Sequence, residues 1–423
     1  MSRALPNWIE AFILPIVNLF LAFLVLGVIL VLLFSAPNEG AWWAAPGHYF
    51  TQYFELLFGL MDTLITGSIS TPTKIEIAGR VLEKPPNFRP LSNVLFYATS
   101  LTFTGLAVAL AFRAGHFNIG GEGQMMLGGA AIGLLLAALT QLVDGNMVAY
   151  GWVQALGGVV MIPVLFIAAG LFGALWIALP AVLQAYRGSH IVITTIMLNA
   201  IASGILIYIL KVEGFIKRPL SSDLATPQAP EMFRLPRLWF PESMPVSGDN
   251  GNIMFFVAVA TSILVWAFLR YTKLGFSIRT TGQNADAARS AGMDPRKITV
   301  IALCLSGMLA GFAATNHVIS NASSFSLREG FTAGLGFTGI AVALLARNNP
   351  LAVPLTALVF GMLIQGGVAV QTEWNGLIDS SIAEAMQGLI VLFIGAFALL
   401  LRYPAQWLWG KFLSDRVDPG GSH

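Results

Sequence analysis

Two amides and one carboxylate stand close together in an otherwise apolar part of the chain: Asn118, Glu122 and Gln124. Three glycines lie between them, which is unusual inside a helix because glycine costs about 1 kcal/mol relative to alanine there. The polar side chains could bind a polar solute, or they could hydrogen-bond broken helix ends to one another. For Glu122, the second interpretation means capping a helix N-terminus or pairing with Arg113 or His116.

Three further polar side chains lie within apolar runs. Thr195 and Asn199 are one helical turn apart, so they form a polar strip on one face of a helix, and Asn316 stands in a later run. Together with Asn118, Glu122 and Gln124 they are our candidates for lining a solute pathway. Helix packing through hydrogen bonds is the alternative for each of them.

Motifs for catalysis, metal binding and cofactor binding are missing from the sequence. It contains no G-x-x-x-x-G-K-[ST] phosphate loop, no H-E-x-x-H and no G-x-S-x-G. Its five histidines are scattered, and Cys304 is its single cysteine, which excludes an intrachain disulfide. We therefore expect no enzyme activity, no metal and no cofactor in this chain, and the net charge of +2 gives no reason to expect nucleic acid.

The composition predicts an all-α polytopic membrane protein. Hydrophobic residues make up 56% of the chain and charged residues only 10%, against roughly 25% charge in soluble domains. A helix needs about 20 apolar residues to cross a bilayer. By this measure we expect about ten transmembrane helices, some of them broken or short: 10–34, 92–112, 118–142, 157–184, 190–210, 252–270, 298–319, 331–346, 350–369 and 385–402.

The basic residues predict the orientation. With the N-terminus inside, the internal segments hold 13 of the 23 basic residues and five of the 21 acidic ones. Short cytoplasmic loops are enriched in Lys and Arg, so this orientation is favoured. Ten spans then place both termini in the cytoplasm.

We divide the chain into three parts. Residues 1–34 form the N-terminal tip and first span, and 35–91 form an external segment. Within the latter, 49–61 has the spacing of an interfacial helix, or alternatively of a short eleventh span. Residues 92–423 form the core, including an external loop at 211–251 with six prolines and a cytoplasmic loop at 271–297.

The cytoplasmic loop contains a short predicted helix. Asn284 is a suitable N-cap, alanines follow it, Gly292 ends the helix, and Pro295 blocks continuation. A small helix that carries Arg289 is suited to docking on another protein. A solvated connector is the alternative.

Four motifs in order resemble one family. These are Phe-Asn-Ile-Gly-Gly-Glu-Gly-Gln at 117–124, Arg-Gly-Ser-His-Ile-Val-Ile-Thr-Thr at 187–195, the loop at 274–292, and Gly-Ile-Ala-Val-Ala-Leu-Leu-Ala-Arg-Asn-Asn-Pro at 339–350. They are similar to ABC-importer permeases of the branched-chain amino acid and simple-sugar class, especially nucleoside permeases that work with basic-membrane-protein-type binding lipoproteins. Departures are the extra length at 71–89, Thr280 in place of alanine and Ala346 in place of glycine.

The resemblance implies a permease subunit in a bacterial cytoplasmic membrane. It implies a second permease subunit as partner, two ABC ATPase subunits that bind the ATP, and an external substrate-binding protein. The solute would be a nucleoside or a related nucleobase or sugar. Alternatives are a simple sugar or a branched-chain amino acid, or a stand-alone secondary carrier. Two groups of spans should repeat with inverted topology, with 117–133 and 330–346 as counterparts. The residues implied in ATPase coupling are Gly275, Arg279, Gly282, Ala287, Arg289 and Gly292.

Overall fold

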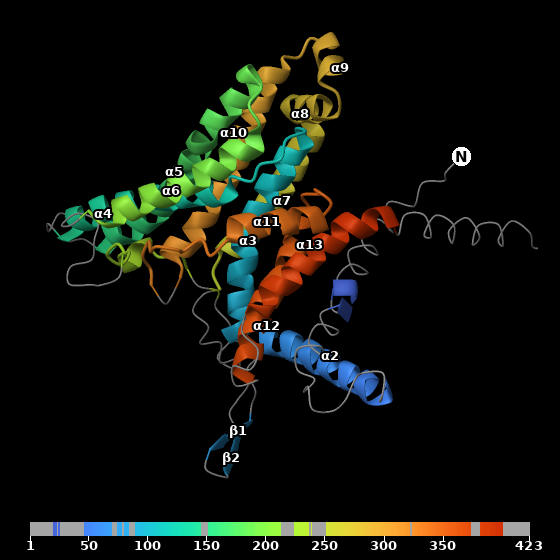
Figure 1. The fold of residues 1–423 in the computed structure, drawn as a ribbon. Helices are drawn as coiled ribbons and strands as arrows, with labels where there is room; N and C mark the ends of the chain where they lie inside the picture. Colours follow the sequence, from blue (N-terminus) through green and yellow to red (C-terminus); the bar gives the residue numbers. More distant parts are fainter. Residues whose placement is uncertain are drawn as a thin grey trace, which may run out of the picture.

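The computed structural model is a bundle of long apolar helices (Figure 1). It describes residues 20–22, 24–25, 46–69, 74–77, 80–83, 89–144, 151–212, 224–236, 238, 251–321, 324–373 and 381–400. Most of the predicted first span, and the C-terminal end after residue 400, lie outside these residues.

The first half of the bundle contains α2 (Pro46–Ile69), α3 (Arg89–Arg113), α4 (Gly121–Asp144), α5 (Gly151–Val182) and α6 (Ile191–Leu210). A π-helical turn, η2 (Leu183–Arg187), extends α5, and η3 (Glu231–Phe233) lies in the loop 211–251. The second half contains α7 (Met254–Tyr271), α8 (Lys273–Gln283), α9 (Ala285–Ser290), α10 (Pro295–Ile319), α11 (Leu335–Leu345), α12 (Val353–Glu373) and α13 (Ile382–Leu400).

Seven of the described helices are long and apolar enough to cross a membrane: α3, α4, α5 with η2, α6, α7, α10 and α12. Each coincides with a predicted span. The predicted span 331–346 is a helix of only 11 residues, α11, so its first part was wrong as helix. Gly330 and Gly334 have positive φ angles, which an α-helix does not allow, so α11 begins only at Leu335.

Two antiparallel helices, α3 and α10, form the centre of the bundle. The end of α3 lies near the start of α10, where His116 contacts Thr299, and the start of α3 lies near the end of α10, where Asn316 contacts Phe96. On one side α10 packs against α4 and α5, and on the other α3 packs against α11 and α12. The first helix of each triplet, α3–α4–α5 and α10–α11–α12, thus packs against the other two helices of the opposite triplet. The inverted repeat with 117–133 and 330–346 as counterparts stays a prediction.

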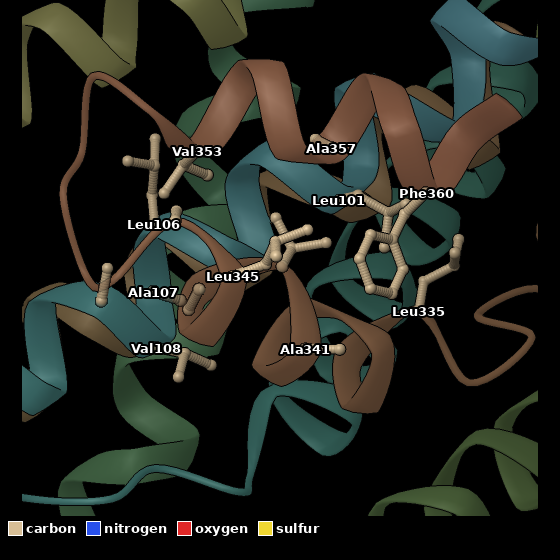
Figure 2. Close-up of a cluster of buried hydrophobic side chains, with 14 of the residues drawn as sticks. Leu101, Leu106, Ala107, Val108, Leu335, Ala341, Leu345, Val353, Ala357 and Phe360 are labelled. Carbon is tan, nitrogen blue, oxygen red and sulfur yellow. The ribbon is translucent and has the colours of Figure 1, made fainter. Parts of the chain in front are cut away.

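Two contacts between the halves are tightly packed. In one, glycines allow α5 and α10 to touch backbone to backbone: a Cβ on Gly173 would lie 2.3 Å from Gly307 O. In the other, aliphatic side chains of α3, α11 and α12 interdigitate, with Leu101, Leu335 and Phe360 all buried (Figure 2). This close packing fixes the positions of α5 and α10 relative to each other, and of α3 relative to α11 and α12.

The segment 35–91, predicted to be external, differs from the prediction in its secondary structure. Helix α2 covers the expected 49–61 but is longer, and Leu60 and Leu64 are buried where it packs against α12. Strands β1 (Lys74–Ile77) and β2 (Arg80–Glu83) form an antiparallel hairpin, with Ile75 paired to Leu82. The all-α prediction missed this hairpin. Its alternating β-branched and charged residues favour strand, but they are too few to stand out from the surrounding segment.

Candidate solute pathway and coupling surface

The break between α3 and α4 is held by a reciprocal amide pair. Asn118 Nδ2 donates to Gln124 Oε1 over 3.1 Å, and Gln124 Nε2 donates to Asn118 Oδ1 over 3.0 Å. The same Asn118 oxygen accepts from the backbone N–H of Gly120 at 2.8 Å. Both amides are buried, so these hydrogen bonds connect the segment after α3 to the first turn of α4 without access of solvent.

Asn118 also connects the break to the two central helices. Its Nδ2 donates to Ser306 Oγ on α10 at 2.9 Å, and Ser306 Oγ donates to Ala107 O on α3 at 2.6 Å. One amide therefore links α3, α10 and the start of α4. We did not predict Ser306, because a serine among apolar residues gives no local signal for so distant a partner.

Glu122 joins the starts of two helices. It lies in the first turn of α4, and its carboxylate accepts from the backbone N–H of Gly334 (3.2 Å) and of Gly336 (2.8 Å) at the start of α11. The helices meet without side chains between them, since a Cβ on Gly336 would lie 2.3 Å from Glu122 N. Each helix N-terminus carries a partial positive charge, and one carboxylate serves both.

Asn199 and Thr195 of α6 lie against the break. Asn199 Oδ1 accepts from the backbone N–H of Gly123, and Asn199 Nδ2 donates to Ile119 O, both at 3.0 Å. Thr195 packs beside Gly120, and its hydroxyl donates to Ile191 O of its own helix. The structure thus brings together five of the six candidate pathway residues, all buried and bonded within this chain.

Asn316 lies elsewhere. It is ten residues from Ser306 on α10, about 15 Å along the helix axis. Its Nδ2 donates to Phe96 O and Ser100 Oγ on α3, and its Oδ1 accepts from Asn252 Nδ2. This is a second polar connection between α3 and α10, at their opposite end.

The predicted cytoplasmic helix is present as α9. Asn284 Oδ1 caps it by accepting from the backbone N–H of Asp286 and Ala287, and Gly292 has φ +79° just beyond it. Ala287, Arg289 and Gly292 are exposed, and Arg289 is paired with Asp286 at 3.0 Å. Figure 1 shows α8 and α9 together beyond the ends of α7 and α10.

The other three coupling candidates lie on α8, which we did not predict. Gly275 allows a tight corner with α7, because a Cβ there would lie 2.2 Å from Phe268 O. Gly282 packs against the end of α3, and Arg279 is half-buried. Thr272 caps α8 by accepting from the Gly275 N–H, a signal present in the sequence that we missed.

His116 follows the residues at the end of α3 that Gly282 contacts, in the turn that precedes the break. Its Nε2 is 3.1 Å from Thr299 Oγ1, and burial lowers the pKa of its imidazole. A neutral ring therefore lies there at pH 7. Within the described ranges, no three His, Cys, Asp or Glu side chains come together as a metal site would require.

Long apolar helices, and the meeting of the starts of long α4 and short α11 inside the bundle, define a polytopic membrane protein. The chain belongs to the family described as branched-chain amino acid transport system / permease component, which matches residues 91–395. It is accordingly an ABC transporter permease, a transport component rather than a catalyst.

Relatives with assigned solutes are moderately similar. The glucose ABC transporter permease TsgB13 of Haloferax volcanii is 32% identical over 74% of this chain and 78% of its own. The guanosine ABC transporter permease NupP of Bacillus subtilis is 30% identical (74% and 81%), and the nucleoside permease NupB of Lactococcus lactis 27% (72% and 79%). A second permease of each of these two bacteria, NupQ and NupC, also matches. No solved structure matches the chain.

Proposed function

We propose that this chain forms the membrane pathway of an ATP-driven importer for nucleosides or related nucleobase or sugar solutes. The contacts of Glu122 are the observation on which the proposed class of solute rests. Half-helix N-termini in transporters commonly bind an anionic group of the substrate. Here the chain's own carboxylate occupies that position, bonded to Gly334 and Gly336, so an uncharged solute fits better than an amino acid.

The relatives support the same range of solutes. Nucleoside permeases match at 27–30% identity and a glucose permease at 32%, so a simple sugar is the second candidate. A branched-chain amino acid has only the family description in its favour. We propose that Asn118, Gln124, Thr195 and Asn199 hold the break between α3 and α4, which borders the path.

We further propose the assembly. A second permease subunit completes the pathway, an inference supported by the paired relatives NupB with NupC and NupP with NupQ. Two ATPase subunits bind the ATP, so this chain needs no cofactor, and an external binding protein delivers the solute. The complex lies in a bacterial cytoplasmic membrane, with ten spans and both termini of this chain in the cytoplasm.

The three proposed parts of the chain remain as defined from the sequence. Of the external loop 211–251, the residues around 224–236 lie over the segment before α11: Thr226 N–H donates to Leu327 O, and Ala229 N–H to Phe325 O. We propose that this layered surface receives the binding protein. The exposed face of α9 is the proposed ATPase contact.

Reconstitution in liposomes tests the function. The complete importer is supplied with its binding protein and with labelled guanosine, glucose or leucine, and we expect it to accumulate the nucleoside. Uptake should require ATP on the side of the membrane where the ATPase subunits lie. Uptake by this chain alone without ATP would instead identify a secondary carrier. Preference for leucine would contradict the argument from Glu122.

Arg289→Glu tests the coupling surface. The reversed charge stands on the exposed face of α9 and adds a second negative charge near Asp286, so docking should weaken while the membrane bundle stays folded. We expect solute uptake per ATP hydrolysed to fall about fivefold or more. Lys211→Glu, the same reversal at an exposed residue after α6, is the control and should leave coupling unchanged. Equal coupling in both variants would place the ATPase contact elsewhere.

A further inference from the structure

The last turn of α8 touches the end of α3 through backbone alone. A Cβ on Gly282 would lie 2.2 Å from Arg113 O and 2.8 Å from Gly115 N. In the other direction, a Cβ on Gly115 would lie 3.1 Å from Gly282 O. These two glycines thus bring the backbones of α8 and of the turn after α3 together with no side chain between them.

The turn at Gly115 leads directly into the break. Gly115 has φ +79°, which allows the chain to leave α3 sharply, and Asn118 follows three residues later. Asn118 is bonded to Gln124 and Ser306, so the position of the turn determines where α4 begins.

The same turn is connected to both ends of α11. At one end, Glu122 holds the N–H groups of Gly334 and Gly336. At the other, Arg113 Nε donates to Asn348 O over 3.1 Å, just beyond the last turn of α11. Any displacement of the turn Arg113–Gly115 therefore acts on the half-helix α11 at two points.

Helices α8 and α9 are built to move together. Asn284 ends α8 and caps α9, and its N–H donates to Thr280 O, so one residue belongs to both helices. The tight corner at Gly275 ties α8 to the end of α7. A push on the exposed face of α9 therefore reaches Gly282 without passing through a flexible linker.

We propose that the backbone contact between Gly282 and Gly115 is the link that carries movement of α8 and α9 to the break and to α11. This inference rests on the proposed ATP-driven function. Backbone atoms in direct contact transmit displacement because no side chain between them can change rotamer and absorb it. Gly282 and Gly115 are thus positioning residues: they act through the Asn118–Glu122 break and touch no solute.

The test is Gly282→Ala in the complete importer, with uptake and ATP hydrolysis measured on the same liposomes. The added methyl cannot fit between α8 and Arg113, so the two must separate. We expect ATP hydrolysis to continue while solute uptake per ATP falls about fivefold or more. Gly204→Ala on α6 is the matched control, since no atom lies within 4 Å of its Cβ position, and it should keep normal coupling.

A second matched pair covers the case in which Gly282→Ala does not assemble. Gly115→Ala introduces a milder overlap with Gly282, together with the strain of a positive φ. Gly188→Ala has the same strain at φ +69° but nothing within 4 Å, so it isolates the contact. We expect uncoupling in Gly115→Ala alone. Equal coupling in these two variants would overturn the proposal.

Failure of the proposed function and failure of the proposed link give different experimental results. If the unaltered complex takes up solute without ATP, the proposed function is wrong and the link goes with it. If the unaltered complex is ATP-driven and assembled Gly282→Ala couples normally, the function stands and the glycine contact is not the link.

Discussion

Replacing Glu122 by glutamine should destabilise the protein by about 2–4 kcal/mol and abolish transport. The carboxylate accepts from two N–H groups, those of Gly334 and Gly336, and it faces the positive ends of two helices. Glutamine has one acceptor oxygen, so its NH₂ group must face one of these donors. Loss of the charge removes the stabilisation of both helix ends as well. The measurement is the midpoint of thermal unfolding of the purified protein, together with uptake in liposomes.

Glu384→Gln is the matched control for this variant. Glu384 also lies in the first turn of a helix, α13, but its side chain is exposed. It should change stability by no more than about 0.5 kcal/mol, as surface substitutions usually do. Similar unfolding midpoints for the two variants would show that the contacts of Glu122 with α11 contribute little.

Replacing Asn118 by leucine should cost about 3 kcal/mol or more, because it removes the acceptor for one buried backbone N–H and both partners of the Gln124 amide. Leucine has nearly the same shape, so a cavity is not the cause. The Ser306 hydroxyl still donates to Ala107 O, and the central pair of helices stays together. Unfolding of the purified variant gives the loss of stability directly.

The double variant Asn118→Leu with Gln124→Met tests where that energy comes from. Methionine removes the buried side-chain amide that leucine leaves without partners, so the double variant should be more stable than Asn118→Leu alone, with only the Gly120 N–H still lacking its acceptor. A double variant that loses the sum of the two single losses would show that the amide pair is not coupled. Recovery of stability without recovery of transport would indicate that the pair also sets the geometry of the pathway.

These predictions share one physical basis. The polar side chains of the break between α3 and α4 are buried and hydrogen-bonded to groups of this chain, so they hold the ends of these helices in fixed positions. An acid placed in an apolar bundle suggests a proton relay when the sequence is considered alone. Its two backbone partners instead favour a structural charge.

Features that depend on nearby residues were predicted well. Seven spans follow from runs of apolar side chains, because a bilayer or a bundle core imposes that composition on every stretch that crosses it. Helix α9 follows from Asn284 and Gly292, since caps act within one turn. Helix α8 was missed because its short, largely polar sequence lacks an apolar run, and its N-cap at Thr272 alone was too weak a signal.

The sequence by itself determined that the protein is a helical membrane permease, and that its chain breaks at Asn118–Gln124. Tertiary structure alone decided what the break does. Glu122 and Gly334 are 212 positions apart, and Asn118 and Ser306 are 188 apart. No periodicity or spacing encodes such pairs; they form only when α3 and α10 pack antiparallel and bring two helix starts together. The same packing separates Asn316 from the other candidates, because its helix is long enough to reach the opposite end of the bundle.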